Sequence, residues 1–104
     1  MLVYAVVMLR IHDRSWCQEY VANVPGIVRT YGGHYLAVGT HVIVEEGDCI
    51  APDQIAILTF PSLSNLEACL SSDEYAPYKA SRMGKANTEI LAFETIRSRQ
   101  HDAG

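Results

Sequence analysis

The sequence predicts one α+β domain with the order strand, helix, strand, strand, helix, strand. The chain has 104 residues, a usual size for a single domain with one core. Short apolar runs rich in β-branched residues alternate with segments in which apolar residues recur every three or four positions. This order is that of the split βαβ motif of ferredoxin-like folds, a four-stranded antiparallel sheet with helices on one face. We expect the domain to span residues 1–97 and a polar tail to span 98–104.

The composition limits the class of protein. Hydrophobic residues make up 49% of the chain and charged residues 19%, which is typical of a globular protein and not of a disordered one. The formal net charge is −4 and no Lys/Arg cluster is present, so we expect no nucleic-acid partner. The three cysteines are far apart in sequence and follow no secretory leader, which predicts free thiols in the cytoplasm.

The first strand is expected over residues 2–9, a valine-rich run typical of a strand buried on both faces. Residues 1–9 resemble neither a signal peptide nor a membrane span. No basic residues precede this apolar run, Tyr4 interrupts it and Arg10 follows it directly, so we expect no membrane partner. Asp13 begins a capping-box pattern that predicts a helix start. The helix face that follows is formed by Cys17, Tyr20, Val21, Val24, Val28 and Tyr31. Pro25 interrupts this pattern and predicts a kink or a second helical piece near Asn23.

Gly32-Gly33 predicts the end of this helix, because glycine adopts the left-handed conformation of a C-terminal cap without penalty. The remaining elements follow from turn residues and apolar runs. They are a strand at 34–38 with a possible extension at 40–44, an exposed acidic loop at 45–53, a strand at 54–60, a helix at 62–72 capped by Ser62, a further helical piece at 73–83 and a strand at 88–96. The first, third and fourth strands are apolar at nearly every position. We therefore expect a homodimer in which the sheet faces without helices pack together.

A set of residues along nearly the whole chain carries a family resemblance. The set is Asp13, Tyr20, Tyr31-Gly32-Gly33, Gly39, Glu46-Gly47, Phe60-Pro61-Ser62, Ser72, Tyr75, Tyr78, Arg82 and Glu94. With these residues the chain resembles the bacterial family called domain of unknown function 1330. The resemblance implies a dimeric α+β barrel, in a superfamily that includes cofactor-free monooxygenases, isomerases, polyketide cyclases and haem-dependent relatives. The chain departs from the usual pattern at His34 and Val38, where basic residues are common, and at Cys17, where an aromatic residue is common.

His34 is the first candidate catalytic residue. Strand alternation predicts that His34, Leu36 and Val38 share one face of the second strand. A neutral imidazole beside apolar neighbours can act as a general base near neutral pH or hold a substrate oxygen, since its ordinary pKa is about 6.5. The alternative is that His34 has no catalytic role and instead makes a structural hydrogen bond or lies in an interface.

Tyr75, Tyr78 and Arg82 follow each other at steps of three and four, so on one helix they share a face. They can present a phenol and a guanidinium to a cleft and bind an anion or a carbonyl. The alternative is a structural role, in which the apolar parts of these side chains pack against neighbouring elements and their polar ends contact solvent. Tyr20 can direct its hydroxyl into the same cleft or be a core aromatic. We therefore predict His34, Arg82 and Tyr78 as catalytic residues, and Tyr20 and Tyr75 as substrate-binding residues.

The sequence contains no spacing typical of a metal site, a nucleotide loop or a thiol nucleophile with a nearby histidine. We therefore expect neither a metal nor another cofactor. The predicted function is a cofactor-independent enzyme, or enzyme-like binder, for a small and largely apolar metabolite. Its reaction would be a proton transfer of the isomerase or cyclase type, with His34 as base and Arg82 or a tyrosine stabilising an oxyanion. The alternatives are a non-catalytic dimeric binding or accessory protein, and a cofactor-free monooxygenase or a haem-binding relative with His34 as axial ligand.

Overall fold

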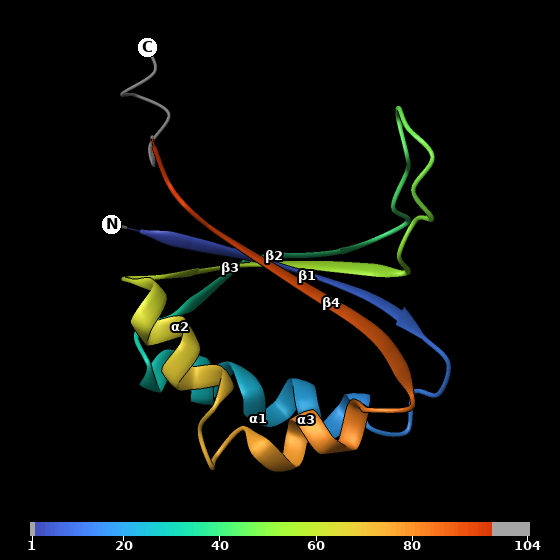
Figure 1. Cartoon of the computed structure of the whole chain (residues 1–104). Helices are drawn as coiled ribbons and strands as arrows, with labels where there is room; N and C mark the ends of the chain where they lie inside the picture. Colours follow the sequence, from blue (N-terminus) through green and yellow to red (C-terminus); the bar gives the residue numbers. More distant parts are fainter. Residues whose placement is uncertain (1, 97–104) are drawn as a thin grey trace.

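A computed structural model describes residues 2–96 of the chain (Figure 1). This part of the chain contains four strands and three helices. In chain order they are β1 (Val3–Ile11), α1 (Cys17–Thr30), β2 (His34–Thr40), β3 (Gln54–Phe60), α2 (Leu63–Leu70), α3 (Ala76–Arg82) and β4 (Ala86–Glu94). The predicted tail at 98–104 lies outside the described residues.

The four strands form one sheet with the spatial order β2-β3-β1-β4. All neighbouring strands are antiparallel, so β1 lies in the middle of the sheet and β2 and β4 form its edges. Figure 1 shows all three helices on one face of the sheet and no helix on the other. The predicted ferredoxin-like α+β fold is confirmed.

The core lies between the helices and the face of the sheet that they cover. Alternation along β1 directs Val3 and Ala5 toward the helices, and the residues directly opposite them on β3 are Phe60 and Leu58. All four side chains are buried. Each full burial of a side chain such as Val or Phe stabilises the fold by about 1.5–3 kcal/mol. On the helix side the core is completed by Val24, Val28, Leu66, Cys69 and Tyr75.

Helix α1 differs from the sequence prediction at its start and at its middle. It begins after Trp16, which makes no side-chain cap hydrogen bond. Asp13 instead accepts a hydrogen bond from the Ser15 N–H at 2.8 Å and organises the preceding turn. The prediction of two helical pieces is wrong, because Pro25 lies inside one continuous helix. Proline removes a single backbone donor, and the buried Val24 beside it holds this stretch against the core.

The end of α1 agrees with the prediction. Gly32 has a φ of 84°, and its N–H donates to the Arg29 carbonyl at 2.9 Å, as in a left-handed helix cap. Gly33 is required for a different reason. A Cβ at this position would lie 2.5 Å from Cε2 of Phe60, so only glycine lets the chain enter β2 this close to the core.

Strand β2 contains an irregularity that corrects the predicted faces. Its register against β3 shifts just after Tyr35. Tyr35 lies opposite Leu58, and Val38 lies opposite Ala56, so both face the helices. The predicted sharing of one face by His34 and Val38 is therefore wrong, because a bulge inserts one residue and reverses the alternation that follows.

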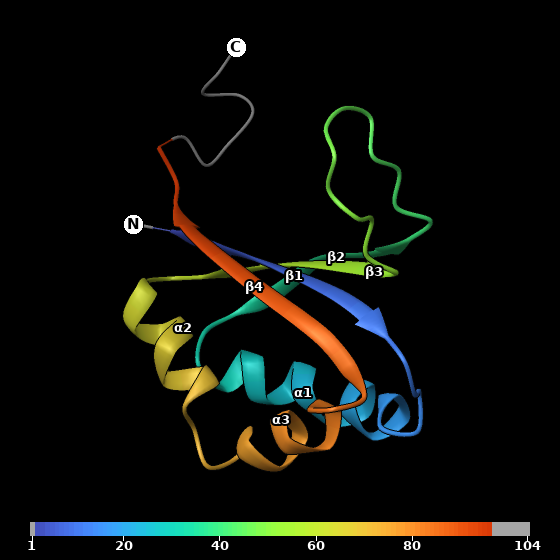
Figure 2. The same ribbon diagram turned by 45° about the vertical axis from the view of Figure 1, so that its right-hand side comes forward.

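The loop at 41–53 replaces the predicted extension of the second strand. Strand β2 ends at Thr40, and His41 adopts a φ of 56°, which turns the chain away from the sheet. Figure 2 shows this loop, in green, rising on the side of the sheet opposite the helices. Ile43 and Ile50 on the loop are each 74% exposed. Asp53 connects the end of this loop to β1, because its carboxylate accepts a hydrogen bond from the Ile11 N–H at 2.7 Å.

The predicted cap of the second helical region at Ser62 is confirmed, whereas α3 begins after Tyr75 without a side-chain cap. The Ser62 hydroxyl accepts the Asn65 N–H at 3.1 Å and caps α2. The Ser72 hydroxyl accepts the Tyr75 N–H at 3.1 Å in the turn that leads into α3. This turn places Tyr75 at the start of α3 and points its ring into the core.

Candidate functional site

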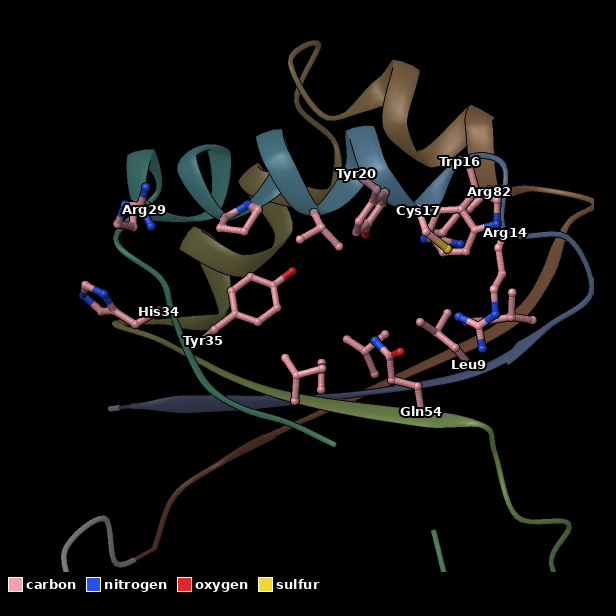
Figure 3. A pocket seen from close by; sticks show the side chains of 16 residues that line it. Leu9, Arg14, Trp16, Cys17, Tyr20, Arg29, His34, Tyr35, Gln54 and Arg82 are labelled. Atoms are coloured by element: carbon pink, nitrogen blue, oxygen red, sulfur yellow. The ribbon is translucent and has the colours of Figure 1, made fainter. Parts of the chain in front are cut away.

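A pocket of about 610 Å³ lies between α1 and the covered face of the sheet (Figure 3). Its floor comes from β1, β2 and β3, and its roof comes from α1 and the end of α3. Much of the lining is apolar. The apolar lining residues are Val7, Leu9, Ile11, Val21, Pro25, Val38 and Ala56. The bulge in β2 brings Val38 into this wall, because it returns that residue to the helix side of the sheet.

Several largely buried polar side chains lie at one end of the pocket. Figure 3 shows Trp16, Tyr20 and Arg82 there. Trp16 precedes α1, Tyr20 lies one turn later, and Arg82 ends α3. The rings of Trp16 and Tyr20 pack edge to face, with centroids 5.2 Å apart and planes at 86°. We name Trp16, Tyr20, Tyr75 and Arg82 the donor cluster.

A hydrogen-bond chain connects three members of the donor cluster. The Nη2 and Nε groups of Arg82 donate to the Tyr75 hydroxyl at 3.1 and 3.4 Å. The hydroxyl oxygens of Tyr75 and Tyr20 are 2.7 Å apart. The structure therefore brings together three of the residues that the sequence predicted for the site, from two helices.

Burial governs the electrostatics of this cluster. Arg82 is only 7% exposed. Burial lowers its pKa, but the hydrogen bond to Tyr75 and the nearby phenols outweigh that effect, so its pKa is raised. Burial, followed by the charge and hydrogen bond of Tyr75, raises the pKa of Tyr20. At neutral pH the Arg82 guanidinium is consequently charged and the Tyr20 phenol is neutral.

Sequence reasoning missed several polar residues that line the pocket, among them Trp16 and Tyr35. Trp16 is 6% exposed, and its Nε1–H is buried without a hydrogen-bond partner among residues 2–96. Its position beside the predicted helix start was the only available signal. Tyr35 directs its hydroxyl into the pocket in Figure 3, and burial raises its pKa to about 12. The bulge in β2 puts Tyr35 and Val38 on one face, and no local residue pattern indicated that bulge.

The remaining predicted residues, His34 and Tyr78, are not members of the donor cluster. His34 is exposed and lines the pocket at the opposite end from Arg82, near Arg29 (Figure 3). The separation arises because His34 opens the edge strand β2, far from the end of α3. Tyr78 does not line the pocket. Its ring instead packs edge to face against Tyr20, with centroids 6.5 Å apart.

Within residues 2–96, no group of three His, Cys, Asp or Glu side chains could hold a metal ion. The three cysteines, all within this range, are free thiols. No helix in the described part of the chain is both long enough and apolar enough to cross a membrane. The polar groups that line the pocket are those of its arginines and tyrosines, the Trp16 indole, His34, the Cys17 thiol and the Gln54 amide.

Comparison with solved structures shows the same fold in several bacterial proteins. A protein of unknown function from Rhodopseudomonas palustris aligns with a TM-score of 0.78 and 12% identity, over 93% of this chain and 84% of that one. SnoaB, a cofactor-independent oxygenase from Streptomyces nogalater, aligns with a TM-score of 0.66 and 11% identity, over 93% and 95%. An ethyl tert-butyl ether D (EthD) family protein from Bacillus halodurans aligns with a TM-score of 0.62 and 16% identity, over 92% and 100%. At these identities the likeness concerns the fold alone.

Sequence comparison is more specific about the family. Among proteins with curated functions, none matches the chain. The model of one family matches residues 2–96, which is almost the whole chain. The resemblance inferred from the sequence motifs is thereby confirmed. The chain belongs to the family described as a domain of unknown function, DUF1330.

Proposed function

We propose that the pocket binds a small, largely apolar metabolite and that the chain is a cofactor-independent enzyme that moves a proton on it. The observation that carries this proposal is the shape and polarity of the pocket. It has apolar walls and gathers its buried polar groups at one end. Such an arrangement buries the body of a ligand while a few polar groups fix its orientation.

The separation of His34 from Arg82 defines how such a reaction would proceed. His34 is exposed at the open end of the pocket, and its ring, once turned toward the cavity, would remove a proton from a carbon of the ligand. The resulting negative charge would move through a conjugated system to an oxygen at the donor cluster, where Arg82 and Tyr20 would stabilise it. Return of the proton to another carbon would complete an isomerisation. In a cyclisation the carbanion would instead attack a carbonyl carbon of the same ligand, and the proton would return to the alkoxide oxygen formed there. A conjugated substrate that spans the pocket is therefore required.

The other predicted residues support the donor cluster. Tyr75 would connect Arg82 to Tyr20, since its hydroxyl contacts both side chains. Tyr78 would act as a positioning residue, because its ring contacts the Tyr20 ring without lining the pocket. The assignment of Tyr78 as a group that touches substrate is not favoured by this position.

The protein is further proposed to be a homodimer through the sheet face that carries no helices. Leu91 and Phe93 on β4 are 59% and 53% exposed, and they face away from the helices together with Tyr4 and Val6. An exposed apolar surface of this kind is typical of an interface. Free thiols suit a reducing compartment, so we also propose a cytoplasmic location.

A cofactor-independent oxygenase is the second candidate. A smaller cavity of about 40 Å³ adjoins the pocket and shares Val7, Tyr20 and Tyr35 with it. Its lining is largely apolar, which suits a small apolar gas better than water. In such a reaction dioxygen is the oxidant: a deprotonated methylene carbon adds dioxygen, and the hydroperoxide loses water to leave a carbonyl. SnoaB, a protein of similar fold, is an oxygenase of this class.

Native mass spectrometry can identify the ligand. The chain is measured as purified and again after incubation with the small-molecule fraction of its source cells. We expect an added mass from an apolar, conjugated molecule. An unchanged chain mass in both samples would contradict the proposed pocket.

The identified molecule then separates the functions. An isomerase or cyclase should incorporate deuterium from heavy water into the ligand, and an oxygenase should incorporate ¹⁸O from labelled dioxygen. We expect His34→Gln to abolish the incorporation while binding is retained, and His41→Gln, in the exposed loop, to leave it intact. Binding without either isotope entering the ligand would favour the non-catalytic binder.

A further inference from the structure

We propose that the ligand carries an anionic oxygen, and that this oxygen binds between the Trp16 indole N–H, the Tyr20 hydroxyl and the Arg82 guanidinium. The inference deepens the proposed function and rests on it. It names the chemical class of the ligand as an apolar molecule with a carboxylate, an enolate or a phenolate at one end. Four observations support it.

The charged residues of the pocket all have one sign. Arg14, Arg29 and Arg82 line it together with His34, and among residues 2–96 no Asp or Glu does. The whole chain has the opposite bias, with 12 acidic residues against 8 lysines and arginines. A cavity with apolar walls and only cationic charges focuses the electrostatic field and attracts anions.

Arg82 is buried without a counter-ion. It is 7% exposed, and within residues 2–96 its side-chain hydrogen bonds go to the neutral hydroxyl of Tyr75 and not to a carboxylate. A guanidinium has five N–H donors, so several remain for a ligand. A buried cation is costly unless an anion accompanies it, and a bound anionic oxygen would supply that partner.

The direction of the hydrogen bonds favours a free Tyr20 proton. A hydroxyl has one proton and two lone pairs. The Tyr75 oxygen accepts two N–H groups of Arg82, so both of its lone pairs are occupied. Either oxygen can be the donor in the 2.7 Å contact between Tyr75 and Tyr20, and these two bonds favour donation by Tyr75. With Tyr75 as the donor, the Tyr20 proton is left to point into the pocket, and the positive charge of Arg82 polarises it through Tyr75.

Trp16 supplies the last donor. Its side chain is 6% exposed, and its Nε1–H is buried with no acceptor in the described part of the chain. An indole N–H can only donate, and a buried donor without a partner is destabilising. Trp16 lines the same end of the pocket as Tyr20 and Arg82, and a bound oxygen that reached its buried Nε1–H would satisfy that donor together with the Tyr20 hydroxyl and the charged Arg82 guanidinium. An oxygen with several lone pairs and a negative charge suits these donors.

Trp16 also makes the inference testable, because it is the only tryptophan in the chain. Its indole N–H gives a single cross-peak in a ¹H–¹⁵N correlation spectrum. The probes are matched pairs, adamantane-1-carboxylate with adamantane-1-carboxamide and 2-naphthoate with 2-naphthamide. We expect each carboxylate to bind at least tenfold more tightly than its carboxamide and to shift the indole proton downfield, as a new hydrogen bond would.

Variants test whether this preference comes from the donor cluster. Arg82→Gln should remove most of the preference for the carboxylate, whereas Arg10→Gln, on an exposed residue outside the pocket, should keep it. If Arg82→Gln does not fold, Tyr20→Phe provides the second test. It removes the terminal hydroxyl and retains the ring, and we expect it to lower the affinity for the carboxylate severalfold.

The outcomes separate the two proposals. Equal affinity for both members of each pair would contradict the proposal that the ligand is anionic, but it would agree with the proposal of an apolar binding pocket. Preference for the carboxylate without a shift of the indole cross-peak would overturn the site, since the anion would then bind at Arg14 or Arg29. Failure of all four probes to bind would contradict the pocket itself.

Discussion

The hydroxyl oxygens of Tyr20 and Tyr75 lie 2.7 Å apart, although the two residues are separated by 55 positions in the sequence. This contact joins the first turn of α1 to the start of α3. Arg82 donates to the same Tyr75 hydroxyl. The hydrogen bonds therefore connect the buried guanidinium of Arg82, through Tyr75, to Tyr20 in the wall of the pocket. Polar groups in an apolar layer are tolerated only when they are paired, so this chain of hydrogen bonds sets the positions of both helices and of the pocket's donors.

Replacing Arg82 with Met should separate stability from binding. Methionine keeps an unbranched stem but removes a buried charge that has no carboxylate partner. Because an apolar side chain in place of a buried charge is often neutral or stabilising, we expect the free energy of unfolding of the ligand-free chain to fall by less than about 1 kcal/mol, or to rise. Urea denaturation gives the free energy, with Arg10→Met as control. A loss of more than about 2 kcal/mol would instead identify Arg82 as a structural anchor of α3.

Much of the fold was predictable because its signals are local. The left-handed turn at Gly32 and the cap at Ser62 depend on residues within a few positions, and strand patterns report burial directly. The wrong predictions concern tertiary context. Pro25 was expected to divide α1, but packing of Val24 and Val28 against the sheet offsets the loss of one backbone donor.

The candidate site was less predictable because it depends on contacts across the fold. Helical spacing grouped Tyr75 with Arg82, but spacing alone could not bring Tyr20 to them from another helix. The bulge in β2 decided which residues of that strand line the pocket, and it depends on pairing with β3. Trp16 was missed because a residue outside a helical pattern gives no periodic signal.

Gly33 is expected to be intolerant of a side chain. A Cβ there would lie 2.5 Å from Cε2 of Phe60, and Phe60 is 1% exposed in the core. Gly33→Ala should therefore lower the free energy of unfolding by about 1–3 kcal/mol, a typical effect of overpacking. Gly39→Ala, which has no atom within 4 Å of the added Cβ, is the control and should change it by less than about 0.5 kcal/mol. Equal effects in chemical denaturation would show that the Phe60 ring moves aside.

The buried phenols should make the fold sensitive to alkali. Burial raises the pKa of Tyr35 to about 12 in the folded chain, whereas an unfolded tyrosine has a pKa of about 10. Between these values the unfolded chain releases a proton that the folded chain keeps. Stability is therefore fully present below pH 10 and decreases as the pH rises toward 12. Urea midpoints measured from pH 7 to 11.5 should decrease less steeply for Tyr35→Phe than for the unmodified chain. Parallel curves for the two proteins would contradict the raised pKa of Tyr35.

A charge placed on the sheet face without helices should disrupt the proposed homodimer. Leu91 is 59% exposed and lies directly opposite Val6 on that face. Burial of a lysine against the same face of a second chain would be unfavourable without an acidic partner, so Leu91→Lys should convert the dimer to a monomer in light scattering coupled to gel filtration. Met83→Lys adds the same charge at a residue that is 63% exposed on the helix side, and it should leave the dimer intact. A dimer that persists with Leu91→Lys, or is lost with Met83→Lys, would locate the interface away from this face of the sheet.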